Sequence, residues 1–295
     1  MKTIQVLRAV HERTVKKWKS CEFIPIEDRK FKILLDDGHS IEAGVFTMES
    51  KGNIEHHACI SSQVGCKFAC RMCSSGKNGF LRNLTAQEIL GEIRLLEEGI
   101  DISRLNEILF MGIGEPLDNY DNFVAALKQL THYSDRLSFA TVGLPDKLIS
   151  LSKEDLPRLK MAWISLHASD DIKRSSIMPV NRVFKISDVL DSAKRFAMAT
   201  KVRVWINYLL FQGFNDFDHD IELLVKLMEG TETYFRVQIS EPNNDLPDYK
   251  AASGAQLELF ERKLKDLGLK NDTFCFKAAG KDVQAGCGEF VYLAK

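Results

Sequence analysis

Three cysteines lie close together in the sequence, Cys66, Cys70 and Cys73, separated by three and then by two residues. Thiolates bind zinc and iron–sulfur clusters, and three of them are one short of filling a tetrahedral metal site or a four-iron cluster. One metal position would therefore be left for a ligand other than the protein. An alternative is a structural zinc site with Cys59 as its fourth thiolate. The usual paired Cys-x2-Cys spacing is absent, so the spacing favours an iron–sulfur cluster.

A second group of candidate residues is Met111-Gly112-Ile113-Gly114-Glu115-Pro116, directly after a predicted strand. A Gly-x-Gly sequence by itself is typical of an ordinary turn. Exposed backbone carbonyls and the Glu115 carboxylate are, however, suited to holding an ammonium group. We expect this turn to lie at the same end of the fold as the cysteine loop.

Alternating strands and helices must position these residues. Apolar runs predict strands at 58–61, 107–110, 137–141, 161–167, 202–210 and 234–239. Periodicity and capping signals predict helices at 85–98, 119–130, 186–199, 218–228 and 256–267. Repeated strand–helix units imply parallel strands whose following loops meet at one end of the sheet. The sequence therefore predicts an α/β fold with a partial six-stranded (β/α)6 barrel.

The N-terminal region is predicted to be a small extension of this barrel. Residues 30–35 and 41–46 form a predicted β-hairpin around the turn Asp36-Asp37-Gly38. Residues 11–19 are predicted to form a short basic helix with a solvated face, and contact with a nucleic-acid backbone is a weaker alternative. We therefore assign a helix-and-hairpin extension to residues 1–55.

The core is assigned to residues 56–295 and includes a C-terminal cysteine loop. A strand at 273–276 is followed by Cys287 between two glycines, and a closing apolar strand is predicted around Phe290. Cys275 lies between two phenylalanines, which favours a packed core thiol.

Composition limits the class of protein. Of the 295 residues, 45% are hydrophobic and 27% charged, as in an ordinary globular protein with a substantial core. Forty basic and 41 acidic residues leave a net charge of −1, so any RNA-binding surface must be local. The N-terminus lacks a secretory signal, and no window approaches the ~18 uninterrupted apolar residues of a membrane span. We expect a cytoplasmic protein without membrane contact, in which the odd number of seven cysteines favours metal binding or redox catalysis over disulfides.

Five motifs resemble those of the RlmN/Cfr family of radical S-adenosylmethionine (SAM) enzymes, whose superfamily signature is the Cys-x3-Cys-x2-Cys loop. In order along the chain they are residues 59–66, 76–85, 111–117, 164–168 and 286–288. The family methylates adenine carbons of large-subunit ribosomal RNA, and some members also act on transfer RNA. The resemblance implies an RNA adenine methyltransferase on a radical-SAM barrel, with C2 favoured over C8, and with a [4Fe-4S] cluster and SAM as cofactors.

The resemblance also implies roles for matching residues. Cys66, Cys70 and Cys73 would bind the cluster, whose unique iron is chelated by the amino and carboxylate groups of SAM. Other contacts to SAM would come from Gly114, Glu115, Ser165, Leu166, His167 and Asn244, with the neighbouring Asn243 as a rival to Asn244.

A pair of thiols would direct the chemistry in this family. Cys287 would carry a methyl group from a first SAM, and a radical derived from a second SAM would take hydrogen from it so that the carbon adds to the electron-poor adenine. Glu42 would accept a proton, and Cys59 would release the methylated RNA, leaving a Cys59–Cys287 disulfide for an external reductant. Electrons for the cluster would come from a donor such as flavodoxin or ferredoxin.

Two features depart from the family pattern. Only residues 1–29 precede the hairpin, where the family carries a larger N-terminal RNA-binding domain. The family's Ser-Thr-Ser-Gly is Ala140-Thr141-Val142-Gly143 here, so either Thr141 compensates for a missing SAM-contacting serine or the pocket differs. The short N-terminus keeps two alternatives open: a radical-SAM enzyme acting on a peptide or small molecule, and a non-catalytic iron–sulfur RNA-binding protein. Cys59 and Cys287 argue against both, because neither needs a thiol pair.

Overall fold

The computed structural model describes residues 1–10, 16–18, 21–100, 105–243, 245–277, 283–284 and 288–291. Its strands are β1 (Lys2–Val10), β2 (Lys16–Trp18), β3 (Cys21–Leu34), β4 (Ser40–Ser50), β5 (Asn53–Ile60), β6 (Gln63–Gly65), β7 (Phe80–Asn83), β8 (Glu107–Phe110), β9 (Leu137–Thr141), β10 (Leu159–Ser165), β11 (Arg203–Leu209), β12 (Phe211–Gln212), β13 (Phe235–Ser240), β14 (Lys250–Ala251) and β15 (Thr273–Phe276). Its helices are α1 (Ala86–Ile100), α2 (Tyr120–Leu130), α3 (Pro145–Leu151), α4 (Asp171–Ile177), α5 (Ile186–Thr200), α6 (Asp218–Met228) and α7 (Gly254–Asp266), with short 3-10 helices η1 (Ser74–Gly76) and η2 (Pro179–Arg182).

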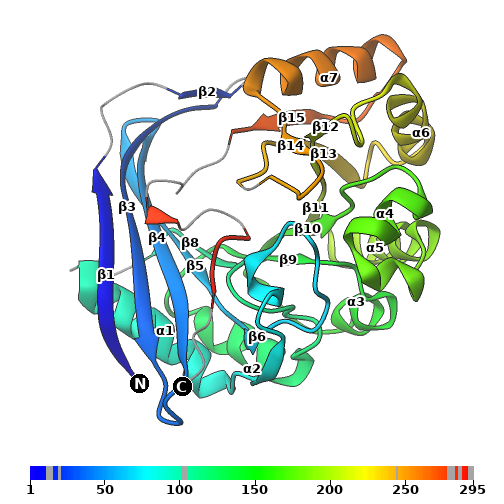
Figure 1. The fold of residues 1–295 in the computed structure, drawn as a ribbon. Coiled ribbons are helices and arrows are strands. Elements are labelled where there is room, and N and C mark those ends of the chain that lie inside the picture. The colour runs from blue at the N-terminus through cyan, green and yellow to red at the C-terminus, as the bar shows by residue number, and fades with distance from the viewer. Residues whose placement is uncertain are drawn as a thin grey trace.

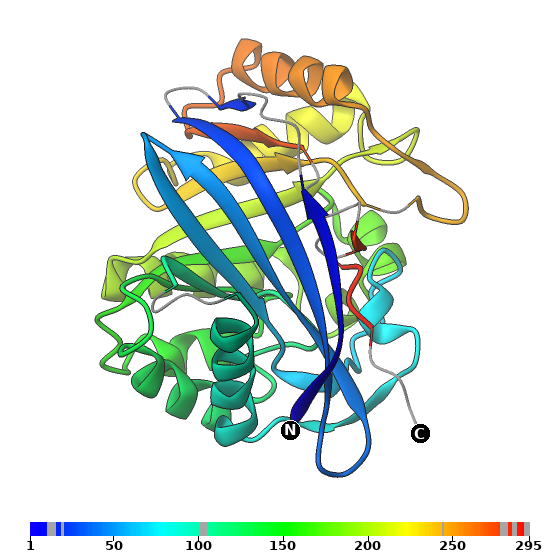
Figure 2. The ribbon, with the colours of Figure 1, turned by 90° about the vertical axis from the view of Figure 1, so that its left-hand side faces the viewer.

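One curved sheet forms the centre of the molecule, in the order β1-β3-β4-β5-β8-β9-β10-β11-β13-β15, with β2 paired to β3 (Figure 1). The pairs from β5 to β15 are all parallel, whereas β1, β3 and β4 add antiparallel strands at one side (Figure 2). The α/β fold with a parallel sheet is therefore confirmed. The strand count differs, because β15 pairs with β13 as a further parallel strand beside the six that were expected.

A row of aromatic rings fixes two helices on this sheet. Phe110 of β8 meets Phe123 of α2 at 4.8 Å between ring centroids, Phe123 meets Phe139 of β9 at 5.5 Å, and Phe139 meets Phe196 of α5 at 6.2 Å. All three contacts are edge-to-face, the arrangement that favours aromatic pairs beyond their buried area. The row therefore holds β8 and β9 in place immediately before the loops that form the site.

The predicted helices correspond to α1, α2, α5, α6 and α7, and their ends follow local chemistry. At the start of α1, Glu88 N–H donates to Thr85 Oγ1 at 3.2 Å and Thr85 N–H donates to Glu88 Oε2 at 2.9 Å, which confirms the predicted capping box. Two helices, α3 and α4, were not predicted. Each has seven residues, too few to display a helical period clearly.

The N-terminal prediction was partly wrong. Residues 16–18 form strand β2 rather than part of a basic helix, because they pair with the start of β3; residues 11–15 and 19 lie outside the described residues. The predicted hairpin is present but longer, since β3 is paired on one side with β1 and on the other with β4. The predicted boundary between the N-terminal extension and the core, at residue 55, falls within β5, which pairs with β4 on both sides of that residue. This boundary stays a prediction.

The predicted closing strand around Phe290 is not formed by the described residues there. Phe290 and Val291 lie outside any strand, and each is instead held by a side chain from elsewhere in the fold. No helix in the described part of the chain is long and apolar enough to cross a membrane.

The loop after β9 depends on a glycine that a larger residue cannot replace. Gly143 has φ +87°, and a Cβ there would lie 2.4 Å from Cγ1 of Val189 on α5. Gly268 has a similar φ of +92° with no atom within 4 Å of such a Cβ. Gly143→Ala should therefore lower the free energy of unfolding by about 1–3 kcal/mol more than Gly268→Ala, because only Gly143→Ala adds a steric clash to the backbone strain.

Urea denaturation of the two variants and the unchanged protein tests this difference. Equal losses of stability in the two variants would mean that α5 moves away from the loop without cost.

Candidate active site

The cysteine loop lies between β6 and η1 and folds back on itself. Cys73 N–H donates to the Cys70 carbonyl at 3.0 Å. Gly76 approaches Ala69 so closely that a Cβ on Gly76 would lie 2.9 Å from the Ala69 Cα, and Ala69 itself has φ +49°. Cys66, Cys70 and Cys73 are all partly buried. The predicted ligands therefore share one tightly folded loop.

The surroundings of these thiols suit a positively charged metal centre. Burial raises the pKa of Cys66 to about 12 and raises the pKa of Cys70 well above its ordinary value, and the charge on Cys73 raises both further. Thiolates placed so close together are stabilised when they bind a metal. Among the described residues, no three His, Cys, Asp or Glu side chains converge on one metal ion. A [4Fe-4S] cluster takes one thiolate on each iron, and the three thiols of the cysteine loop fit three of these positions.

The turn after β8 is locked against the strand that leads into the cysteine loop. Gly114 has φ +101°, and a Cβ there would lie 2.5 Å from the Cβ of Gln63 in β6. The N–H of Glu115 donates to Gln63 Oε1 at 2.9 Å. The close approach explains the glycine, and it brings the two candidate motifs together as expected.

The Glu115 side chain points into the fold and binds backbone groups. Its carboxylate accepts hydrogen bonds from the N–H of Leu117 at 3.1 Å and of Val142 at 2.8 Å. Burial raises the pKa of Glu115 to about 7, although a hydrogen bond with the Thr141 side chain and the two backbone donors favour ionisation. Thr141 therefore contacts this carboxylate. It belongs to the segment Ala140-Thr141-Val142-Gly143, which differs from the family's Ser-Thr-Ser-Gly.

The loop after β10 contains Ser165, Leu166 and His167, and it is held against β11. His167 has φ +59°, and its Nδ1 accepts a hydrogen bond from Leu209 N–H at 3.1 Å. Burial, together with the nearby charge of Arg174, lowers the pKa of His167 to about 3. The imidazole is therefore neutral, with its proton on Nε2.

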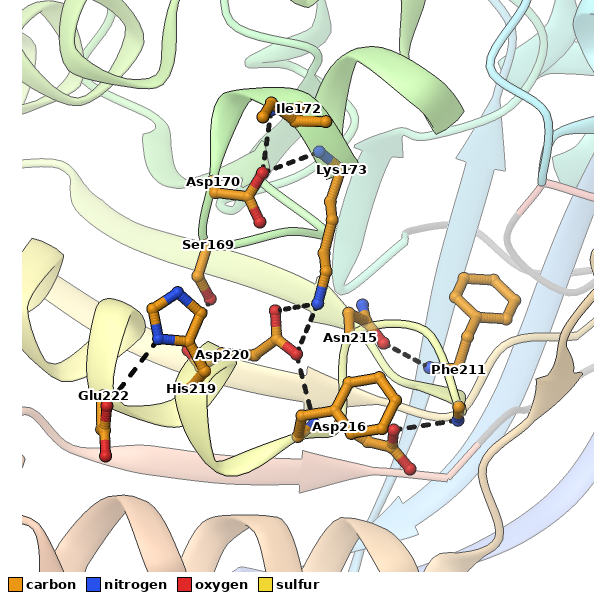
Figure 3. Close-up of polar contacts among 12 residues, drawn as sticks. Ser169, Asp170, Ile172, Lys173, Phe211, Asn215, Asp216, His219, Asp220 and Glu222 are labelled. Atoms are coloured by element: carbon orange, nitrogen blue, oxygen red, sulfur yellow. Dashed lines mark hydrogen bonds and ion pairs between the residues drawn. The ribbon is translucent and has the colours of Figure 1, made fainter.

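A buried asparagine, Asn215 in the turn between β12 and α6, also holds the loop after β10. Asn215 Nδ2 donates to the carbonyls of His167 and Leu209, both at 2.8 Å. Its Oδ1 accepts from Phe211 N–H at 2.8 Å, the bond drawn in Figure 3. One amide thus satisfies three backbone groups between neighbouring strand ends.

Arg174 of α4 is a buried residue that sequence reasoning missed. Its guanidinium donates to backbone carbonyls after β9 and β10, and its charge lies close enough to Cys70 to lower the pKa of that thiol. The cysteine loop also touches the same helix, because Arg71 N–H donates to the Ile177 carbonyl at 2.9 Å. An arginine in a charged segment gives no sequence signal of this kind.

The described C-terminal residues bridge the cysteine loop and the N-terminal strands. Four hydrogen bonds hold them: Ser74 N–H to the Gly288 carbonyl at 2.7 Å, Ser75 Oγ to the Phe290 carbonyl at 2.9 Å, Lys30 Nζ to the Gln284 carbonyl at 3.1 Å and Val291 N–H to Glu42 Oε2 at 2.9 Å. Cys287 itself lies outside the described residues, as does Asn244.

Cys59 and Glu42 share one face of the sheet. Cys59 of β5 pairs with Gly44 of β4, and Glu42 is two residues further along β4, so their side chains leave the sheet on the same side. A Cβ on Gly44 would lie 3.1 Å from Cζ of Phe290, which places the C-terminal residues against this face. Glu42 Oε1 lies 3.2 Å from Lys30 Nζ, and both side chains are buried.

Comparisons with known proteins agree with this geometry. Residues 60–228 match the model of the radical SAM superfamily. A probable dual-specificity RNA methyltransferase RlmN from Fervidobacterium nodosum is 35% identical over 88% of this chain and 74% of its own length. The chain belongs to the RlmN family of radical SAM proteins.

Two further RlmN-family and radical SAM relatives support this placement. The dual-specificity RNA methyltransferase RlmN of Sulfurovum sp. is 34% identical over 88% of this chain and 76% of its own length. A crystal structure of a radical SAM methyltransferase from Sphaerobacter thermophilus superposes with a TM-score of 0.80 at 28% identity, covering 91% of this chain and 81% of that one. The cofactors of the RlmN family are a [4Fe-4S] cluster and SAM. The three thiols of the cysteine loop fit the cluster.

The residues predicted for this RlmN-family site fall into two groups. One lies at the carboxyl ends of the parallel strands: Cys66, Cys70, Cys73, Gly114, Glu115, Ser165, Leu166 and His167. The other lies on the face formed by β4 and β5: Glu42 and Cys59. Sequence reasoning gave no role to Gln63, although it lies within the motif at residues 59–66, and it missed Arg174 and Asn215, which contact mainly backbone groups and lie outside the motifs.

Glu115 should make the stability of this protein depend on pH. Its pKa of about 7 lies above the 4.5 of an ordinary glutamic acid, so the folded state binds more protons between these values and loses stability as pH rises through them. From pH 5 to pH 7.5 the Glu115 contribution should fall by about 2–3 kcal/mol.

Glu115→Gln removes this titration and leaves one backbone N–H facing an amide NH2, so the variant should be less stable by about 1–3 kcal/mol at pH 5, with a flatter pH profile. Urea denaturation of both proteins without SAM, across this pH range, measures the two effects. Parallel pH profiles would contradict the assignment.

Proposed function

We propose that this RlmN-family protein is a radical SAM methyltransferase that methylates an adenine carbon of ribosomal or transfer RNA, with C2 favoured over C8. The main support is the bridging position of the C-terminal residues. Gly288, next to Cys287 in the chain, is bonded to the cysteine loop, while Val291 is bonded to Glu42 on the face that carries Cys59. A methyl-carrying thiol needs access to both groups of residues.

The cysteine loop and the strand ends are proposed to hold the cofactors. Cys66, Cys70 and Cys73 would ligate the cluster, which when bound supplies a single electron to SAM. The SAM contacts proposed are Gly114, Glu115, Ser165, Leu166, His167 and Asn244, with Asn243 as the alternative to Asn244. The Glu115 carboxylate accepts hydrogen bonds from two backbone N–H groups and from the Thr141 side chain, and its two oxygens have about four acceptor sites, so one site is left for an ammonium group.

The thiols and Glu42 are proposed to perform the remaining steps. Cys287 would take the methyl group. That methyl would lose one hydrogen atom to the radical derived from SAM, and its carbon would add to the base, whose own hydrogen would leave as a proton while the surplus electron would pass to the oxidised cluster. Glu42 accepts a proton, and it has a fixed position between Lys30 and the Val291 N–H. The Cys59 thiolate then attacks the Cys287 sulfur; the carbon–sulfur bond breaks, its electron pair stays with carbon, and a proton completes the methyl group. The resulting disulfide needs an external reductant, and the cluster needs a donor such as flavodoxin or ferredoxin.

A Cys59→Ala variant should trap the covalent protein–RNA intermediate, because it lacks the thiol that breaks the carbon–sulfur bond. We expect a stable adduct on denaturing gels and in mass spectra after anaerobic incubation with SAM, reductant and ribosomal RNA.

Cys275→Ala is the matched control, since Cys275 donates to the Leu257 carbonyl at 3.5 Å, between β15 and α7, and should leave release intact. No adduct in a Cys59→Ala protein that binds its cluster and SAM normally would count against RNA as the substrate.

Analysis of modified nucleosides identifies the substrate carbon. Ribosomal and transfer RNA from cells that contain the protein should carry more 2-methyladenosine than RNA from cells that lack it, measured by chromatography and mass spectrometry. A gain in 8-methyladenosine alone would reverse the preference for C2. If both nucleosides were unchanged, a peptide or small molecule would become the better candidate substrate.

A further inference from the structure

Arg174 has the largest fully buried side chain among the described residues, and no part of it is exposed. Its hydrogen bonds span two loops and one short helix: Nη2 to the Val142 carbonyl at 2.7 Å and to the Ser165 carbonyl at 2.8 Å, Nε to the Leu166 carbonyl at 3.1 Å, and Nη1 to Asn181 Oδ1 at 2.8 Å. All of these acceptors are neutral. The Arg174 side chain therefore binds mainly backbone carbonyls rather than a charged partner.

Most acceptors of Arg174 belong to the rim of the site, meaning the loops at the carboxyl ends of β8 to β11, where the SAM contacts are proposed. Val142 is held from both sides, because its N–H donates to Glu115 and its carbonyl accepts from Arg174. Ser165 and Leu166, whose carbonyls also accept from Arg174, are themselves proposed SAM contacts. One guanidinium thus sets the spacing between the loop after β9 and the loop after β10.

We propose that Arg174 is a positioning residue that holds these two loops at the spacing that SAM binding requires. Only a guanidinium has the shape for this task. It is planar and presents donors in several fixed directions, whereas a lysine ammonium is a single point on a flexible stem. Lysine at this position keeps the charge but loses the simultaneous contacts to Leu166 and Asn181.

The charge of Arg174 also suits this location. None of the hydrogen-bond acceptors named above is a carboxylate, and the charges of Cys70 and Asp171 attract the guanidinium through space. A buried cation without a bonded anion is costly unless a nearby negative charge offsets it. Thiolates on the adjoining cysteine loop supply such a charge when the cluster is bound.

The inference rests on the SAM-binding part of the proposed function and is independent of RNA. SAM affinity is therefore measured by equilibrium dialysis on anaerobic, cluster-loaded protein without RNA, alongside iron content and thermal unfolding. We expect Arg174→Met to raise the dissociation constant of SAM at least ~tenfold, and Arg174→Lys to raise it by about threefold or more, at unchanged iron content.

A control on the same helix separates positioning from general loss of stability. Lys173 Nζ lies 2.6 Å from Oδ1 and 2.7 Å from Oδ2 of Asp220 on α6, on the side of α4 seen in Figure 3. The double variant Lys173→Met, Asp220→Asn removes this ion pair without touching the carbonyls that Arg174 binds. It should lower the unfolding temperature yet leave SAM affinity within about twofold of the unchanged protein.

Three results would overturn the proposal. The first is an Arg174→Met protein that binds SAM as tightly as the unchanged protein. The second is an equal loss of SAM affinity in the Lys173, Asp220 double variant. If Arg174→Met does not fold, the test rests on Arg174→Lys, and full SAM affinity in that variant would show that charge alone suffices. SAM binding by the unchanged protein without any RNA methylation would instead count against the proposed function and leave the Arg174 proposal standing.

Discussion

The site depends on how buried backbone groups are satisfied where the parallel strands end. Beyond the last ladder hydrogen bond, each chain still carries N–H and C=O groups that are costly to bury without partners. Here three side chains supply those partners: Glu115 binds the N–H groups of Leu117 and Val142, Arg174 binds carbonyls after β9 and β10, and Asn215 binds carbonyls of the β10 and β11 loops. The loops after four neighbouring strands are thereby connected.

This arrangement determines the charge at the rim as well as its shape. Burial keeps His167 neutral and raises the pKa of Glu115 to about 7, whereas Arg174 stays charged because burial lowers its pKa only to about 10. The rim therefore offers a carboxyl group that can ionise near an ammonium and a cation that lies close to the thiols.

Much of the fold could be predicted because its signals are local. Apolar runs predicted the parallel strands β5, β8, β9, β10, β11 and β13, and α6 was predicted with its observed ends. The helix predicted for the basic segment was wrong at Lys16–Trp18, because pairing of these residues with β3 overrides their local helical preference. The same contrast holds in the site. Cys66, Cys70 and Cys73 could be predicted from their spacing. Arg174 could not, because it binds backbone carbonyls distant in sequence, and every residue type carries such a carbonyl.

The antiparallel strands carry the second group of candidate residues, and the C-terminal residues connect it to the cysteine loop. Ser74 and Ser75 hold Gly288 and Phe290 next to the cysteine loop, and Glu42 holds Val291 on the face of the sheet that also carries Cys59. Glu42 therefore has a structural task in addition to its proposed role as a proton acceptor, since its Oε2 binds this backbone while Oε1 faces Lys30. A proton taken up by Glu42 would weaken its attraction to Lys30. The proposed proton transfer and the hold on the C-terminal residues would thus act on the same carboxylate.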